Sequence, residues 1–134
     1  MRDGGEKKTI LAVDDAPENI DVLTGILKAD FKIKVALNGE KALKIAGKAP
    51  PDLILLDVMM PGMDGFAVRE QLQADPATAG IPVVFVTGEA PEAVEEKSPG
   101  SAGVLVKPVE PAVLSATLNE CIRRREPHTA PVVG

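Results

Sequence analysis

The chain has 134 residues, of which 45% are hydrophobic and 26% are charged, and this composition predicts one globular domain with an ordinary core. Its formal net charge of −5 argues against direct binding to nucleic acid or to an anionic membrane, because both depend mainly on Lys and Arg meeting phosphates. No apolar run is long enough to cross a bilayer, and no signal-peptide core follows Met1. The single cysteine, Cys121, cannot form an internal disulfide. We therefore expect a cytoplasmic protein.

The two ends of the chain differ in character from its middle. Residues 1–8 form a charged, glycine-bearing lead, and residues 126–134 carry two prolines and no periodicity, as in a flexible tail or a linker stub. His128, the one histidine, has no acid, base or nucleophile near it in sequence, so we assign it no catalytic role. We therefore expect a single folded domain over residues 9–125.

Strand-like and helix-like patterns alternate five times along that domain. The expected strands are short runs rich in Val, Ile and Leu, at residues 9–13, 32–36, 52–56, 82–86 and 104–106. Side chains three or four apart predict the helices between and after them: Ile20, Leu23 and Leu27; Leu43 and Ala46; Phe66, Arg69 and Leu72; Leu114, Leu118 and Ile122. Strict alternation predicts a doubly wound α/β fold, with a five-stranded parallel sheet and helices on both faces.

Local signals mark where the helices begin and end. Pro17 fits the first turn of the first helix, and Asn38 can cap the second. Asp64-Gly65 predicts a turn before the third helix. The fourth helix must fit between Pro91 and the breaker at residues 98–100, which leaves only about two turns.

Five polar side chains fall at or just beyond expected strand ends: Asp14, Asp15, Asp57, Thr87 and Lys107. The carboxyl ends of parallel strands meet at one edge of a sheet, so we expect these side chains to lie together. Three clustered carboxylates repel each other without a cation, and Mg²⁺ is a hard ion that prefers such oxygen ligands. Lys107 and the Thr87 hydroxyl can then contact phosphoryl oxygens, and a carboxylate in that setting can act as a nucleophile that carries an aspartyl phosphate.

The same residues resemble a known family. Asp14-Asp15, Asp57 followed by Val-Met-Met-Pro-Gly-Met-Asp-Gly, Thr87, and Lys107-Pro108 are similar to the receiver domain of two-component response regulators, including the chemotaxis-regulator type, over about residues 8 to 124. The resemblance implies a flavodoxin-like receiver fold that takes a phosphoryl group from a sensor histidine kinase or a histidine phosphotransfer protein and signals to a downstream protein. Asp57 corresponds to the phosphoacceptor. A receiver is a regulatory domain and not an enzyme, apart from weak self-dephosphorylation.

The resemblance also implies a set of ligands for the metal. Asp15 and Asp57 would coordinate Mg²⁺ directly, Asp14 would assist through water, and the backbone carbonyl of Met59 would complete the protein ligands. Lys107 would pair with the phosphoryl group. The Lys107–Pro108 peptide bond that follows it is usually cis in the family.

Two features depart from the family pattern. Receivers usually carry Tyr or Phe three residues before the lysine, where this chain has Val104, and the fourth helix is shortened. We therefore expect the signal to be carried by Thr87 and by residues 88–103, because few apolar contacts should hold that segment.

Two other functions fit parts of the pattern. The acids alone would permit a metal-dependent phosphatase with an aspartyl nucleophile, although the sequence shows no substrate cap and no dedicated acid–base pair. A pseudo-receiver, which would act only as a protein-interaction module, would not need the complete set of acids, Thr and Lys.

Overall fold

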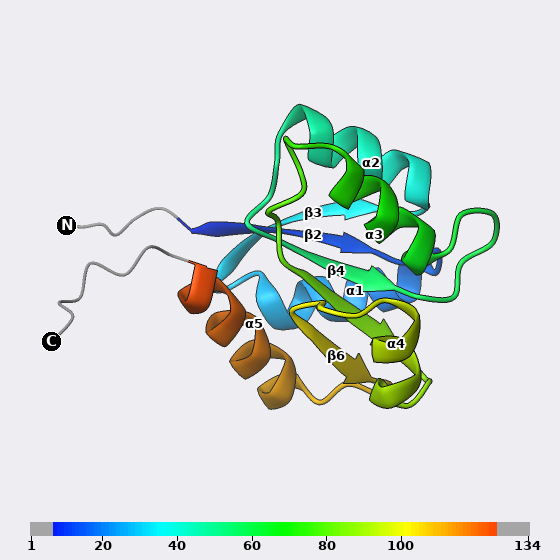
Figure 1. Cartoon of the computed structure of the whole chain (residues 1–134). Helices are drawn as coiled ribbons and strands as arrows, with labels where there is room; N and C mark the ends of the chain where they lie inside the picture. The colour runs from blue at the N-terminus through cyan, green and yellow to red at the C-terminus, as the bar shows by residue number, and fades with distance from the viewer. Residues whose placement is uncertain (1–6, 126–134) are drawn as a thin grey trace, which may run out of the picture.

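The computed structural model describes residues 7–125, so the first six residues of the expected lead over residues 1–8, the tail at residues 126–134 and His128 lie outside the described part. Five parallel strands form one sheet in the order β3-β2-β4-β5-β6 (Figure 1). The strands are β2 (Lys8–Val13), β3 (Phe31–Ala36), β4 (Leu53–Asp57), β5 (Val83–Thr87) and β6 (Gly103–Val106). The helices are α1 (Pro17–Leu27), α2 (Gly39–Lys48), α3 (Gly65–Ala74), α4 (Pro91–Lys97) and α5 (Pro111–Arg125). The doubly wound parallel sheet and the short fourth helix are confirmed.

Each strand sends alternate side chains to opposite faces of the sheet, and helices cover both faces. On β2, Ile10 and Ala12 belong to the core cluster beneath α1 and α5, whereas Leu11 and Val13 belong to the cluster beneath α2, α3 and α4. Figure 1 shows these two layers of helices. The central strands β4 and β5 are buried on both faces and are almost entirely apolar, whereas the edge strand β3 carries Lys32 and Lys34.

The order of the strands creates the crevice that positions the site. The chain runs from β2 outward to β3 and then returns to the other side of β2 to form β4. Val13 pairs with Leu56, so the carboxyl ends of β2 and β4 are adjacent. In doubly wound sheets this reversal point is where ligands bind.

Caps and apolar stripes explain most of the helices. Asn38 accepts a hydrogen bond from the Lys41 amide at 2.8 Å, and Asp64 accepts one from the Ala67 amide at 2.9 Å, so each caps the start of its helix. The predicted stripe residues of α1 and α5 are buried. The stripe of α3 differs from an ordinary apolar stripe, because Arg69 lies within it and is only 7% exposed.

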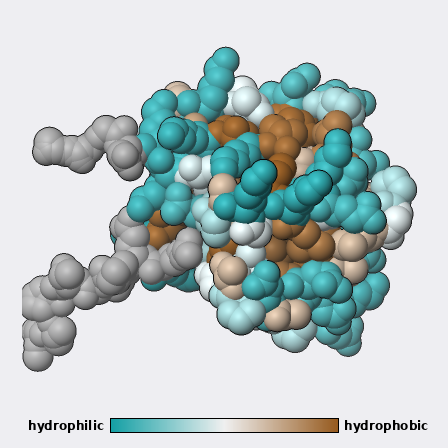
Figure 2. Space-filling model, turned by 90° about the horizontal axis from the view of Figure 1, so that it is seen from above, coloured by the Kyte–Doolittle hydropathy of each residue, from teal (hydrophilic) through white to brown (hydrophobic). Residues whose placement is uncertain are grey.

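The surface is mainly polar, with hydrophobic atoms visible between the polar side chains in the view of Figure 2. The large hydrophobic side chains that are exposed within residues 7–125 are Val22, Val35, Leu37, Met59, Val106 and Val113. None of the helices in this part of the chain has both the length and the apolar composition that crossing a bilayer requires.

Candidate functional site

Three carboxylates meet where β2 and β4 end. Asp14 and Asp15 follow β2 directly, and Asp57 is the last residue of β4. Each offers one carboxylate oxygen to a cluster in which these atoms lie within 4.8 Å of one another. Asp14 and Asp57 are buried, whereas Asp15 is exposed. The apolar strands thus hold two acids below the surface and a third at the rim.

Neighbouring groups fix the position of Asp14. One of its oxygens accepts the Ala16 amide at 2.9 Å, and the other accepts the Asn19 side-chain amide at 3.1 Å. Asn19 was not among the predicted site residues. Its position in the first turn of α1, five residues after Asp14, is the signal that could have identified it.

Lys107 reaches the cluster from the end of β6. Its Nζ lies 3.5 Å from Oδ1 of Asp57 and 3.7 Å from Oδ2 of Asp14, and its side chain is 36% exposed. The Lys107–Pro108 peptide bond is cis, as the resemblance implied. The ammonium group therefore bridges two of the three acids and can also meet a ligand from solvent.

Thr87 lies at the same edge of the sheet, but its hydroxyl contacts the loop that follows β5. It ends β5, is 1% exposed, and its hydroxyl oxygen accepts the Glu89 amide at 3.1 Å. Within residues 7–125 this hydroxyl makes no hydrogen bond to Asp57. The bond from Glu89 uses a lone pair of the hydroxyl oxygen, so the hydroxyl can still donate its proton to a phosphoryl oxygen.

The loop after β4 approaches the site through its backbone. The Met59 amide donates to Oδ1 of Asp57 at 3.3 Å, while the Met59 side chain is 67% exposed. Gly65 begins α3 and donates its amide to the Val58 carbonyl at 2.9 Å. A Cβ at Gly65 would lie 2.4 Å from the Asp57 carbonyl oxygen, so this close approach requires glycine. The sequence predicted a turn at Gly65 but not its contact with the site.

Burial and like charge raise the pKa of Asp57. Desolvation is the largest cause, and the negative charge of Asp14 adds to it, whereas Lys107 and the Met59 amide favour the ionised form and lower the pKa. The cluster therefore contains an acid whose ionised form is destabilised, and a bound cation would relieve that cost.

This shift predicts how stability depends on pH when no metal is present. Because the folded-state pKa is raised, ionisation of Asp57 opposes folding, and stability is lost as pH rises through the folded-state pKa. We expect Asp57→Asn to be more stable than wild type near neutral pH in EDTA, with a gain that shrinks as the pH falls. Urea unfolding across that pH range would measure it, with the exposed Asp21→Asn as the control. A gain that grows towards low pH would contradict the account.

The donor set fits Mg²⁺. Three carboxylates within ligand reach of one point offer hard oxygen atoms, and they include the exposed acid through which an ion could enter from solvent. Among residues 7–125 this is the one group of three or more His, Cys, Asp or Glu side chains placed to hold a metal ion.

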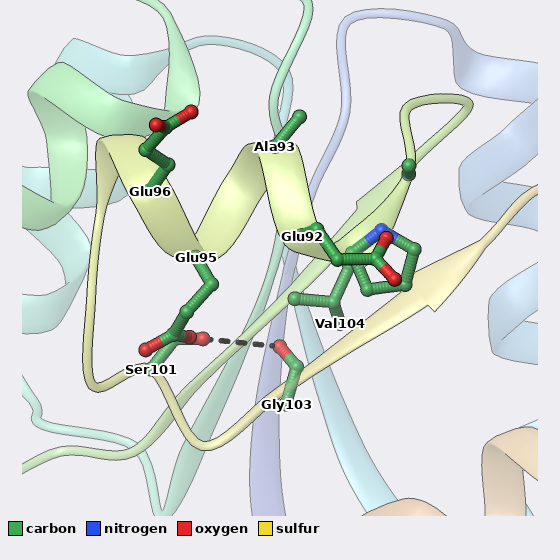
Figure 3. A pocket seen from close by; sticks show the side chains of 9 residues that line it. Glu92, Ala93, Glu95, Glu96, Ser101, Gly103 and Val104 are labelled. Atoms are coloured by element: carbon green, nitrogen blue, oxygen red, sulfur yellow. Dashed lines mark hydrogen bonds between the residues drawn. The ribbon is translucent and has the colours of Figure 1, made fainter.

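An open groove of about 940 Å³ lies between α4 and β6. Figure 3 shows Val104 and Gly103 of β6 on one side of it and the α4 residues Glu92, Glu95 and Glu96 around it. Val104 is one of the residues that line this groove. The structure therefore offers an acid-rimmed groove at the position where the sequence lacks an aromatic residue.

Comparison with known proteins agrees with this geometry. Residues 10–119 match the model of the response regulator receiver domain. Protein PilH of Pseudomonas aeruginosa is 38% identical over 113 residues, which cover 82% of this chain and 93% of PilH. Response regulator PleD of Caulobacter vibrioides is 40% identical over 120 residues, which cover 85% of this chain and 26% of PleD.

The same likeness appears in solved structures. Chemotaxis response regulator CheY4 of Vibrio cholerae aligns with a TM-score of 0.80 at 34% identity, covering 87% of this chain and 99% of that chain. The present chain thus spans nearly the whole of PilH and CheY4 but about a quarter of PleD. The predicted flavodoxin-like receiver fold is confirmed, and the chain belongs to the family of response regulator receiver domains.

Proposed function

We propose that this domain accepts one phosphoryl group on Asp57, in the presence of Mg²⁺, and changes conformation in response. One observation supports this most strongly: the oxygens of Asp14, Asp15 and Asp57 gather within 4.8 Å of one another, with the Lys107 ammonium 3.5 Å from Asp57. Receiver domains as a family are regulatory phosphoaccepting domains. The proposal extends that family role to named residues of this chain.

The positions of these groups support a direct transfer. A carboxylate oxygen of Asp57 forms a bond to phosphorus while the bond between phosphorus and the donor histidine nitrogen breaks, and that nitrogen takes up a proton. Lys107 pairs with a phosphoryl oxygen after leaving its present position beside Asp57 and Asp14. Asp15, Asp57 and the Met59 carbonyl would hold Mg²⁺, with Asp14 assisting through water, and the ion would supply positive charge that offsets the repulsion between the acids and the incoming phosphoryl group.

The partners follow from the same chemistry. The donor is a sensor histidine kinase or a histidine phosphotransfer protein, since receiver domains take their signal from such proteins, and the receiver passes the signal to a downstream protein in the cytoplasm. The net charge of −5 disfavours nucleic acid as the direct target. The functional unit comprises residues 9–125, flanked by a lead and a tail or linker.

A phosphorylation assay separates this proposal from its competitors. With acetyl phosphate and Mg²⁺, we expect the intact mass to increase by one phosphoryl group, and no increase in EDTA. A pseudo-receiver would incorporate nothing under either condition. An aspartyl phosphatase would release many equivalents of phosphate from phosphoester substrates, whereas a receiver would release little.

The conformational response should centre on Thr87 and α4. Val94 is fully buried, but Ala93 is only half-buried and the helix has seven residues, too few to be stable without packing. We expect fast amide hydrogen exchange over residues 92–97 in the free protein and altered protection there when beryllofluoride, a stand-in for the phosphoryl group, is bound. Strong protection that does not change on binding would show that the signal leaves through another surface.

A further inference from the structure

The side chain of Arg69 crosses from α3 to the end of α4. It is only 7% exposed, and its Nη1 donates to the Ser98 hydroxyl at 2.7 Å, the Ser98 carbonyl at 3.2 Å and the Pro99 carbonyl at 3.0 Å. Carbonyls at the end of a helix have no partner within the helix, so the guanidinium caps α4 from a neighbouring element. One nitrogen of Arg69 therefore accounts for all its hydrogen bonds to the described residues.

The rest of the guanidinium is buried without a matching acceptor. Among residues 7–125, no carboxylate forms an ion pair with Arg69, and no acceptor takes a hydrogen bond from its Nε or Nη2. Burial lowers the pKa of Arg69, and the carboxylate of Glu95 acts in the opposite direction, but arginine stays charged at neutral pH. A buried charge of this kind is costly unless it is paired, so the free Nε and Nη2 edge favours a negatively charged ligand.

Arg69 borders a cavity. A space of about 270 Å³ lies between α3, the segment that leads into β5 and the segment that leads into β6. Arg69 is the one charged side chain in its lining, and the others include Gln73 and Thr78. A Cβ at Gly100, which also lines the cavity, would lie 3.7 Å from Nη2 of Arg69, so this nitrogen lies next to the cavity wall. The lining thus combines one buried positive charge with polar groups.

The cavity is separate from the carboxylate cluster. Its lining includes Pro82 and Val83, where β5 begins, whereas Thr87 ends the same strand at the carboxylate edge. It is also smaller than the roughly 300–1,000 Å³ typical of sites for drug-sized molecules. Its size and charge therefore fit a small anion with few atoms.

We propose that this cavity binds a small oxyanion, such as phosphate or a carboxylate, through the Nε and Nη2 edge of Arg69. Arginine presents two parallel donors along this edge, in the geometry that pairs with two oxygens of one anion. Nη1 keeps its bonds to Ser98 and Pro99, so an anion bound here would reinforce the connection between α3 and the end of α4. The proposal does not depend on phosphorylation of Asp57.

Nuclear magnetic resonance titration of the full chain in EDTA tests this site. Sodium phosphate and sodium acetate are added in separate series at an ionic strength held constant with sodium chloride. We expect saturable shifts, with dissociation constants in the millimolar range, at the amides of Gly80, Gly100 and Ser101. A stronger response to phosphate would identify phosphoryl-type anions as the preferred ligand, and a stronger response to acetate would identify carboxylates.

Substitutions distinguish this site from general anion binding. Arg69→Met should abolish the saturable shifts, while Arg124→Met, which removes an exposed arginine of α5, should leave them unchanged. If Arg69→Met does not fold, Arg69→Lys keeps the charge without the paired donors and should weaken binding at least several-fold. Shifts that do not saturate, that chloride reproduces, or that persist at equal affinity in Arg69→Lys or in folded Arg69→Met would overturn the proposal.

Discussion

Replacing Gly65 with alanine should lower the free energy of unfolding by at least about 2 kcal/mol, a typical cost of forcing an extra methyl group into close-packed structure. The added Cβ would lie 2.4 Å from the Asp57 carbonyl oxygen and 2.9 Å from the Cα of Val58. Both are backbone atoms at the end of a buried strand, so no side-chain rotation can relieve the contact. The strand end itself would have to move, and Asp57 would move with it.

A second glycine provides a matched control for that substitution. Gly47 lies within α2, and a Cβ there would meet nothing within 4 Å. Gly47→Ala should therefore stabilise the protein by up to about 1 kcal/mol, because alanine has a higher helix propensity than glycine. Urea unfolding followed by circular dichroism measures both variants. Equal stabilities for Gly65→Ala and Gly47→Ala would show that the loop after β4 can relax and does not constrain Asp57.

Saturating Mg²⁺ should raise the free energy of unfolding of the wild-type protein by about 1 to 3 kcal/mol, because the ion binds the folded cluster and not the unfolded chain. Asp15→Ala should remove most of that response. Asp15 is the exposed member of the cluster, so its loss should have little direct effect on the packing of the core.

Thermal unfolding in Mg²⁺ and in EDTA measures this effect. Asp21→Ala, which removes an exposed carboxylate of α1 away from the strand ends, should keep the full response to Mg²⁺. A wild-type unfolding curve that is the same in Mg²⁺ and in EDTA would exclude the proposed metal site.

The fold was predictable largely because its central strands, β4 and β5, are buried on both faces. Apolar runs such as Leu53 to Leu56 mark the strands to within one residue of their observed bounds, and the alternation with helices leaves few possible topologies. The candidate site was predictable for a related reason. The carboxyl ends of parallel strands converge, so residues as distant in sequence as Asp14, Asp57 and Lys107 become neighbours.

Other features depend on contacts that no local pattern encodes. Periodicity placed Arg69 on the buried stripe of α3, but its partners Ser98 and Pro99 lie about thirty residues further along the chain. Likewise, Asp64-Gly65 predicts a turn, yet only the packed structure shows that Gly65 touches the backbone of Asp57. The contact of Arg69 with the end of α4 therefore depends on how α3 packs against the loop before β6.

Locating the phosphoryl group tests the central claim most directly. Wild-type protein, Asp57→Asn and Asp64→Asn are each incubated with a histidine-phosphorylated donor and Mg²⁺, and the modified peptide is identified by mass spectrometry. Asp64 serves as the control because its carboxylate caps α3 outside the cluster. The account predicts one phosphoryl group on Asp57 in the wild type and in Asp64→Asn, and none in Asp57→Asn. Equal labelling of Asp57→Asn, or a phosphoryl group on another residue of the wild-type protein, would contradict it.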